Sequence, residues 1–212
     1  MPTLPTNPHN VGDSSHVNDH NLIVTALSGA VYASGQTGTV DLSGATVKGA
    51  GLDLVYASDF TSSSGINVDS VFTDTYLNYK IIITFTASTS EGGGIAMKLR
   101  ASGTSSSTGY YWAGSYSSST ALSNYNGANQ SNWVAAAGTG TKAGFTEINV
   151  YQPKTAAITT GTATFIHWSS GNSTVYGYNL MLLHNVTTAY DGFSITPPTA
   201  MTGKIKVYGY RN

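Results

Sequence analysis

YKIIITF, residues 79–85, alternates large apolar side chains with lysine, isoleucine and threonine. Successive side chains of a β-strand point to opposite faces, so the first, third, fifth and seventh residues of this segment share one face. Residues 95–99, IAMKL, repeat the same period after a polar segment at residues 90–94. We expect two strands that face each other across this segment and that each bury one apolar face.

The same alternation recurs along the chain from residue 52 onward. Apolar and β-branched residues form short runs separated by glycine- and serine-rich turns, which is typical of an all-β protein. About eight to ten strands are enough for two packed sheets, so we predict a β-sandwich over residues 52–212, with a jelly roll as its form. The further candidate strands are residues 54–56, 66–72, 110–116, 145–151, 163–168, 174–184, 193–196 and 204–210.

The composition is notable for its low charge. Only 9% of the 212 residues are charged and the net charge is -1, so the chain lacks the basic surface that nucleic acid requires. Cysteine is absent, which excludes disulfides and thiolate metal sites. We expect no membrane span, because no apolar run reaches ~18 residues, and no signal peptide at the amino terminus. Serine and threonine make up about a quarter of the chain, a composition common in extracellular and particle-surface proteins.

The first 51 residues differ from the β-rich body. Residues 1–12 carry three prolines between small polar residues and predict an extended arm. Residues 13–29, DSSHVNDHNLIVTALSG, predict a short α-helix, because Asp and Ser can accept hydrogen bonds at its start and Gly29 can close its end. Residues 30–51 have a glycine every few residues and predict a connector.

The predicted helix has a narrow apolar seam. Val17, His20, Val24 and Leu27 follow one another at spacings of three, four and three residues, which places them on one side. A helix of about fifteen residues is marginal in water and needs a partner, either the strand-rich body of its own chain or copies of itself. The narrow seam favours copies that meet on a shared axis, with His20 fixing the register. His16 and His20 could instead hold a metal ion with help from elsewhere, but we predict no metal.

The sequence offers little for catalysis. A glycosidase needs two carboxylates on either side of the scissile bond, whereas the Asp and Glu residues of this chain are scattered singly. Nucleophile-elbow, phosphate-binding and HExxH motifs are absent. His167 and His184 fall inside predicted strands, where we expect sheet residues rather than ligands. We therefore expect a protein that is not an enzyme and that needs no cofactor.

The long region between residues 103 and 144 concentrates aromatic side chains. Loops with this many rings are costly to expose unless something covers them. The rings could form a platform for a glycan, because Tyr and Trp faces stack on sugar rings. They could also pack between subunits or cap one end of the sandwich, and we favour this packing interpretation. The candidate residues are Tyr110, Tyr111, Trp112, Tyr125 and Trp133.

Residues 9–27, HNVGDSSHVNDHNLIVTAL, resemble the G-D-x-x-H-x-x-D-H-N opening and following helix of bacteriophage minor tail, tail-fibre and baseplate-associated proteins. Residues 71–83, 97–103 and 203–211 resemble the jelly-roll domain that phages place on tails and sometimes on heads. The segments occur in the order found in that family, and residues 104–200 have no matching motif.

This resemblance implies a homotrimeric component of a virion. It leaves open whether the chain sits on the tail or on the capsid surface, and of the two we expect the tail. It implies that residues 1–29 attach to other virion proteins and align the subunits, while the β domain is displayed outward. It supplies no catalytic residues. Contact of the β domain with a host cell-surface glycan is an open expectation. The alternatives are a carbohydrate-binding adhesin and a decoration or head-fibre protein of the capsid surface.

Overall fold

The computed structural model describes residues 51–211 except residues 89–93, 120, 138–142 and 170–173. These residues are all-β, and they include no helix that could cross a membrane. Their strands all belong to the second of two compact units, Lys48–Asn212. The predicted arm, the predicted helix with Val17, His20, Val24 and Leu27, and all but the last residue of the predicted connector lie outside the described residues.

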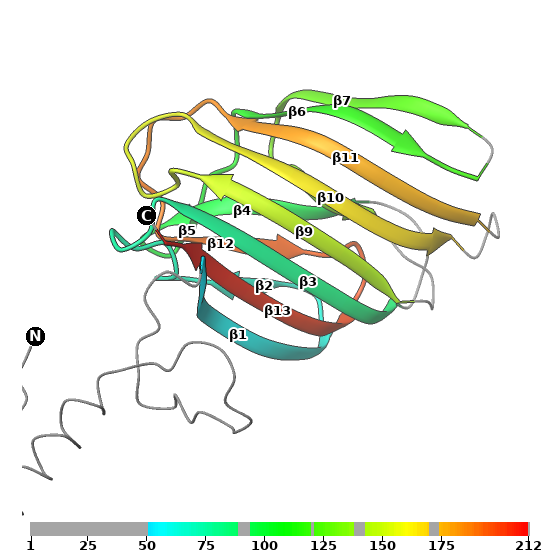
Figure 1. Ribbon diagram of the computed structural model, residues 1–212, viewed down its shortest axis with the longest axis horizontal. Coiled ribbons are helices and arrows are strands. Elements are labelled where there is room, and N and C mark those ends of the chain that lie inside the picture. The colour runs from blue at the N-terminus through cyan, green and yellow to red at the C-terminus, as the bar shows by residue number, and fades with distance from the viewer. Residues whose placement is uncertain (1–50, 89–93, 120, 138–142, 170–173, 212) are drawn as a thin grey trace, which may run out of the picture. The chain divides into compact units, whose positions relative to one another are not determined.

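The larger sheet has eight strands, each antiparallel to its neighbours (Figure 1). The first and last strands of the β domain lie side by side at one edge. The opposite edge is formed by a strand from the middle of the chain. The order across the sheet is β1 (Leu52–Ser63), β13 (Met201–Tyr210), β3 (Asn78–Ser88), β9 (Gly144–Tyr151), β10 (Thr159–Ser169), β11 (Thr174–His184), β6 (Tyr110–Ser117) and β7 (Leu122–Gln130).

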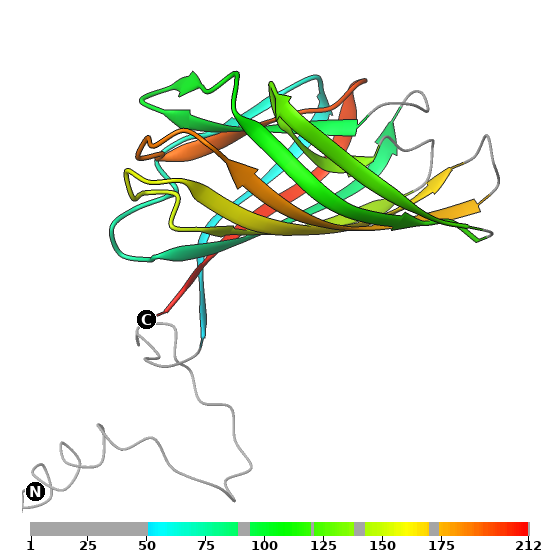
Figure 2. The same cartoon turned by 90° about the horizontal axis from the view of Figure 1, so that it is seen from above.

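The smaller sheet has five strands and forms a second layer (Figures 1 and 2). Two short strands pair with the same long strand, one near its beginning and one at its end. All pairings are again antiparallel. The order is β2 (Ile66–Val68), β12 (Gly192–Thr196) and β4 (Gly94–Ala101), followed by β8 (Trp133–Ala137) and β5 (Thr104–Ser105), which both pair with β4.

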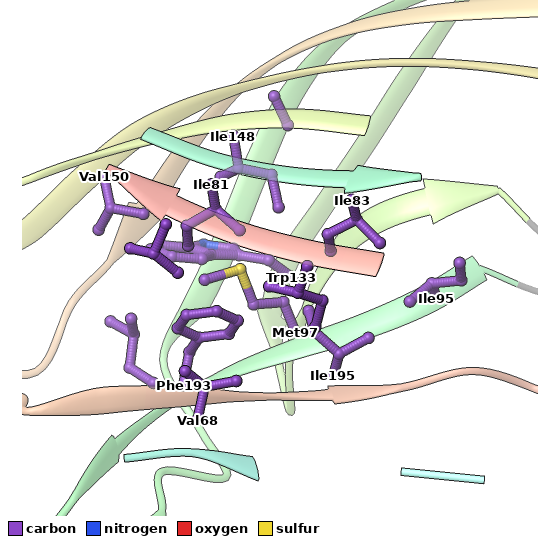
Figure 3. Close-up of a cluster of buried hydrophobic side chains, with 14 of the residues drawn as sticks. Val68, Ile81, Ile83, Ile95, Met97, Trp133, Ile148, Val150, Phe193 and Ile195 are labelled. Carbon is purple, nitrogen blue, oxygen red and sulfur yellow. The ribbon is translucent and has the colours of Figure 1, made fainter. Parts of the chain in front are cut away.

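One apolar core fills the space between the sheets (Figure 3). The predicted alternation of residues 79–85 is confirmed, because β3 buries its first, third, fifth and seventh residues of that segment. β4 does the same with Ile95, Met97 and Leu99. From the other strands, Phe193 and Ile195 of β12 and Ile148 and Val150 of β9 belong to the same cluster. Alternation therefore decides which side of each strand is buried.

The relation between β3 and β4 differs from the expectation that they face each other across the polar segment. They belong to different sheets: β3 pairs with β13 and β9, whereas β4 pairs with β12 and β8. Their buried residues contact the same core from opposite sides, so the two strands face each other through the core. The period of a strand fixes its buried face but not its pairing partner, which explains the difference.

The strands pair in a nested pattern. β1 pairs with β13, β2 with β12, β3 with β9 and β4 with β8, so each pair lies inside the preceding one in sequence. The remaining strands are two insertions into this pattern. β5, β6 and β7 lie between β4 and β8, and β10 and β11 lie between β9 and β12. In space β10, β11, β6 and β7 extend the larger sheet beyond β9 (Figure 1).

Two predicted segments need correction. Residues 103–144, predicted to be long loops around one strand, contain β5, β6, β7 and β8. β7 was missed because its sequence, LSNYNGANQ, has few residues that favour strands. The strand predicted at residues 66–72 ends at Val68. Beyond it, the amides of Val71 and Phe72 both donate to the carbonyl of Asp191 instead of joining a sheet.

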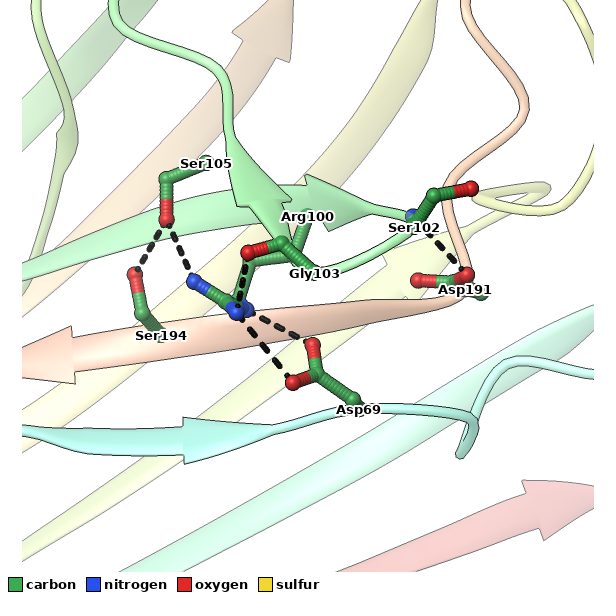
Figure 4. Close-up of polar contacts among 7 residues, drawn as sticks. All are labelled: Asp69, Arg100, Ser102, Gly103, Ser105, Asp191 and Ser194. Atoms are coloured by element: carbon green, nitrogen blue, oxygen red, sulfur yellow. Dashed lines mark hydrogen bonds and ion pairs between the residues drawn. The ribbon is translucent and has the colours of Figure 1, made fainter.

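Arg100, near the end of β4, joins several strands of the smaller sheet (Figure 4). Its Nε and Nη2 donate to the two carboxylate oxygens of Asp69 at 2.6 and 3.2 Å. Nη1 donates to Ser105 Oγ at 3.0 Å, and Nη2 donates to the Gly103 carbonyl at 2.5 Å. The Ser105 hydroxyl lies 3.2 Å from that of Ser194 on β12. One buried guanidinium thus connects β4, the β5 hairpin and the end of β2.

Arg100→Met should lower the free energy of unfolding by about 2–3 kcal/mol, because it removes hydrogen bonds to a charged group and leaves the Gly103 carbonyl without its partner. Urea denaturation at neutral pH measures this change. Lys98→Met, which removes a cation from the same strand, should change the free energy by no more than about 0.5 kcal/mol. Equal effects of the two substitutions would contradict the role assigned to Arg100.

Candidate functional site

The outer face of the larger sheet divides into a charged half and an uncharged half. The charged half carries ion pairs, such as Lys204 of β13 with Asp59 of β1 at 3.1 Å. Lys80 of β3 and Glu147 of β9 form the last such pair, at 2.8 Å. Beyond them, β10, β11, β6 and β7 contain no Asp, Glu, Lys or Arg. The two insertions therefore supply a neutral surface next to a charged one.

A groove lies on this neutral surface. Its main part has a volume of about 560 Å³, and an adjoining hollow of about 410 Å³ shares Ala113 and Met181 with it. Ligand sites typically have volumes of ~300–1,000 Å³, so the main part alone is large enough for a small ligand. The side chains that point outward into the groove are Tyr111, Ala113, Asn126, Tyr151, Thr160, Met181 and Leu183.

Strand register arranges these residues in rows across the sheet. The first row contains Tyr111, Leu183, Thr160 and Tyr151, which lie side by side on β6, β11, β10 and β9. The two tyrosines thus stand at opposite ends of the row. Three strand intervals separate them, or roughly 14 Å at the usual ~4.8 Å spacing of strands.

The second row contains Asn126, Ala113, Met181, Thr162 and Asn149 in the same strand order, starting from β7. Its polar side chains near β9 are already paired, because the Asn149 amide donates to the Thr162 hydroxyl at 3.2 Å. Met181, in the middle of the row, is 66% exposed. The middle of the second row therefore combines the exposed apolar side chain of Met181 with the small side chain of Ala113.

Four polar side chains of the groove have no hydrogen-bond partner within the described part of the chain. They are the hydroxyls of Tyr111, Tyr151 and Thr160 and the amide of Asn126. In the row beyond them, by contrast, Thr164 donates to the amide oxygen of Asn179 at 3.0 Å. Polar groups that can bind a ligand thus lie mainly around the first row.

Two hydrogen bonds join the sheets directly beneath this row. The Leu99 amide on β4 donates to the Tyr110 hydroxyl on β6 at 2.8 Å. Trp133 Nε1 on β8 donates to the carbonyl of Leu183 on β11 at 3.0 Å. The Tyr110 and Trp133 rings are fully buried and meet edge-on, with centroids 5.4 Å apart. The strands that form the groove are therefore fixed to the smaller sheet by directional contacts.

His184 belongs to the same buried cluster. Its ring stacks on Tyr110 with centroids 4.1 Å apart, and its Nε2 lies 2.6 Å from the Tyr190 hydroxyl. Burial lowers the pKa of His184 below its ordinary value of about 6.5. His184 is therefore neutral in the folded protein at neutral pH, and no charge is placed beneath the groove.

The fold should lose stability as the pH falls through the range where unfolded His184 gains a proton. The unfolded chain binds this proton near pH ~6.5, whereas the folded protein binds it only at lower pH, so stability is complete above pH ~6.5 and decreases below it. Urea denaturation at about pH 7.5 and about pH 5 should show this decrease. His184→Gln should show a smaller decrease between the same two pH values. An equal decrease in both proteins would contradict the assignment.

A second aromatic cluster lies on the inner face of the same strands. Trp112 and Tyr125 are half-buried, with ring centroids 6.3 Å apart. Tyr178 stacks on Phe165 at 4.3 Å, and burial raises the pKa of Tyr178 to about 12. Trp112, Tyr125 and Tyr178 pack against the core.

Of the residues predicted to contact a glycan or another subunit, Tyr111 and Trp112 line the groove, and of these two only Tyr111 has its side chain on the outer face. Tyr110 and Trp133 have no exposed surface, so for these two the prediction of ligand or subunit contact is wrong. Trp112 and Tyr125 pack on the inner face. The predicted loops are strands, and residues next to each other in a strand point to opposite faces, which explains why the set is divided.

The other groove residues were not found from the sequence. Tyr151, Thr160, Asn126 and Met181 come from four different strands, and only the register of those strands brings them together. The sequence does contain one usable signal, the absence of charge from β6, β7, β10 and β11. Both strand histidines lie in strands as predicted, His167 in β10 and His184 in β11, and both are buried.

Within the described residues, no group of three or more His, Cys, Asp or Glu side chains is placed to hold a metal ion. Comparisons with protein-family models, curated proteins and solved structures find no match. The function has to be inferred from the fold of this chain and from the chemistry of its surface.

Proposed function

We propose that the chain is a non-enzymatic structural component of a bacteriophage virion, a minor tail or tail-fibre protein that displays its β domain outward. The nested strand pairing carries this proposal. β1 with β13, β2 with β12, β3 with β9 and β4 with β8 form one antiparallel ribbon that is rolled into two layers. Such a ribbon supports the jelly-roll form of the β-sandwich, an architecture used by viral capsid proteins and lectin domains.

The segments that resemble phage jelly-roll domains support the same assignment. Residues 71–83 run into β3, residues 97–103 cover the end of β4, and residues 203–211 cover β13. β3 and β13 are neighbours in the larger sheet, with Ile81 opposite Val207. The resembling segments therefore belong to the nested ribbon. Residues 104–200, which have no matching motif, contain both insertions together with β8, β9 and β12.

A homotrimer is part of the proposal, and one end of the neutral surface supports it. Ile166 and Phe145 are cross-strand partners, and they are 50% and 38% exposed. Val175, which is paired with Trp168 in the next row, is 47% exposed. Exposed apolar residues that lie together mark interaction surfaces, so this end of the sheet suits contact with a neighbouring subunit.

The trimer is tested through the predicted helix at residues 13–29. Light scattering on the full chain should give about three times the 22.1 kDa of one chain. Val24→Asp or Leu27→Asp should reduce the mass to that of a monomer, because a carboxylate in the seam cannot be buried between subunits. Far-UV circular dichroism should show unchanged strand content. Ala26→Asp, on the other side of the predicted helix, should leave the mass unchanged. A wild-type monomer at micromolar concentration would rule out the trimer.

The position in the virion is tested by electron microscopy of particles that carry a tagged carboxyl terminus. Gold label on the tail is the expected result. Label on the capsid would instead support the alternative of a capsid-surface decoration or head-fibre protein. Purified particles without any label, from cells that express the tagged chain, would contradict a structural role in the virion.

A further inference from the structure

We propose that the groove between Tyr111 and Tyr151 binds a neutral saccharide. We call it the tyrosine groove and define it by Tyr111, Asn126, Tyr151, Thr160 and Met181. This inference goes beyond the structural role proposed above and does not depend on it, because it rests only on the chemistry of the groove.

The apolar surfaces of the groove match one side of a saccharide. A pyranose ring presents C–H groups on its faces, and these pack well on the faces of aromatic rings. Tyr111 and Tyr151 supply such rings at the two ends of the first row, and Tyr151 is 37% exposed. Met181 and Leu183 supply flexible apolar contact between them.

The polar groups of the groove match the hydroxyls of a saccharide. Each sugar hydroxyl both donates and accepts hydrogen bonds, and so do the Thr160 hydroxyl and the Asn126 amide. Among the described residues, neither side chain has a hydrogen-bond partner in the chain itself. The neighbouring Thr164 and Asn179 already bond to each other, so they offer less to a ligand. Free polar groups thus surround the part of the groove where the two rings stand.

The charge of the groove selects a neutral ligand. Phosphate, carboxylate and ammonium groups bind tightly where charged side chains can pair with them. The four strands β6, β7, β10 and β11 carry none of these side chains. On β9, Glu147 is neutralised by Lys80 at 2.8 Å. An acidic or basic saccharide would therefore lose its hydration in the groove without gaining a partner of opposite charge.

The groove is also held in place before any ligand binds. Its residues lie on paired strands. Tyr111 directly follows Tyr110, and Leu183 directly precedes His184, and the side chains of Tyr110 and His184 are buried on the inner face. The hydrogen bonds from Leu99 to Tyr110 and from Trp133 to Leu183 fix those strands. A rigid site loses less entropy on binding, which favours weak ligands such as oligosaccharides.

A second copy of the chain is the competing occupant. A stable protein interface covers about 800 Å² on each partner and excludes water from an apolar centre. Packing a sheet onto the groove would bury the unpaired Asn126 and Thr160 side chains, each at a cost. The exposed apolar pair Ile166 and Phe145 lies two rows away, outside the groove. Subunit contact therefore suits the apolar end of the sheet and leaves the groove open.

The test is isothermal titration calorimetry on the full chain with uncharged hexasaccharides of β-1,4-glucose, β-1,4-mannose, β-1,4-N-acetylglucosamine and α-1,6-glucose. Hexagalacturonate is the charged probe. At least one uncharged probe should bind, and hexagalacturonate should bind more weakly than it. Tyr111→Ala and Tyr151→Ala should each weaken binding roughly tenfold, and Thr160→Val should weaken it without changing the shape of the groove. Ile166→Ala, on the same face but outside the groove, should leave the affinity unchanged.

Three results would overturn the proposal. They are binding of none of the four uncharged probes, tighter binding of hexagalacturonate, and equal affinity of the wild type and the two tyrosine variants. Light scattering on Tyr111→Ala adds a further check, because a lower mass than that of the wild type would assign the groove to a second copy of the chain. Urea denaturation of each variant establishes that it is folded. Failure of these experiments would leave the virion assignment intact, since that assignment is tested by labelled particles.

Discussion

Two hydrogen bonds connect the sheets beneath the groove, a buried one from the Leu99 amide to Tyr110 and a partly buried one from the Trp133 indole to the Leu183 carbonyl, and they give the contact between the sheets its direction. Apolar contact between sheets is non-directional, so it leaves their relative position weakly defined. A buried donor without a partner costs about 1–3 kcal/mol, so a placement of β4 and β8 against β6 and β11 that satisfies both donors is favoured. The positions of the strands that form the groove therefore depend on polar contacts made on the opposite face of the same strands.

The sequence predicted features that depend on neighbouring residues, and it missed features that depend on the pairing of distant strands. The buried faces of β3 and β4 could be predicted because a period of two is visible within a few residues. Their membership of different sheets could not, since it depends on pairing with β13 and β12, which lie roughly a hundred residues away. β7 was invisible because Asn, Gly and Ser disfavour strands, and pairing with β6 overrides that preference. Its Gly127 is also required, because a side chain there would collide with the Trp112 ring.

The candidate site illustrates the same limit at the level of single residues. The cluster of rings from residue 110 to 112 was recognised, but its division between the two faces was not. A shift of one residue in the start of β6 would have exchanged Tyr110 and Tyr111 between core and groove. Tyr151 and Thr160 join Tyr111 only because β9, β10 and β11 stand in one register. No spacing in the sequence records that arrangement.

The ribbon and the insertions also present surfaces of different chemistry. The nested pairs carry the ion pairs, including that of Asp53 in β1 with Arg211 after β13 at 2.6 Å, and they bury most of the core. The insertions carry no charge on their strands, and hydroxyls and amides keep their outer face in water instead. Outward-facing residues of β10 and β11 can change without altering any pairing of the ribbon, because β10 pairs with it only along β9. A neutral binding surface can thus be built beside the ribbon while the scaffold stays constant.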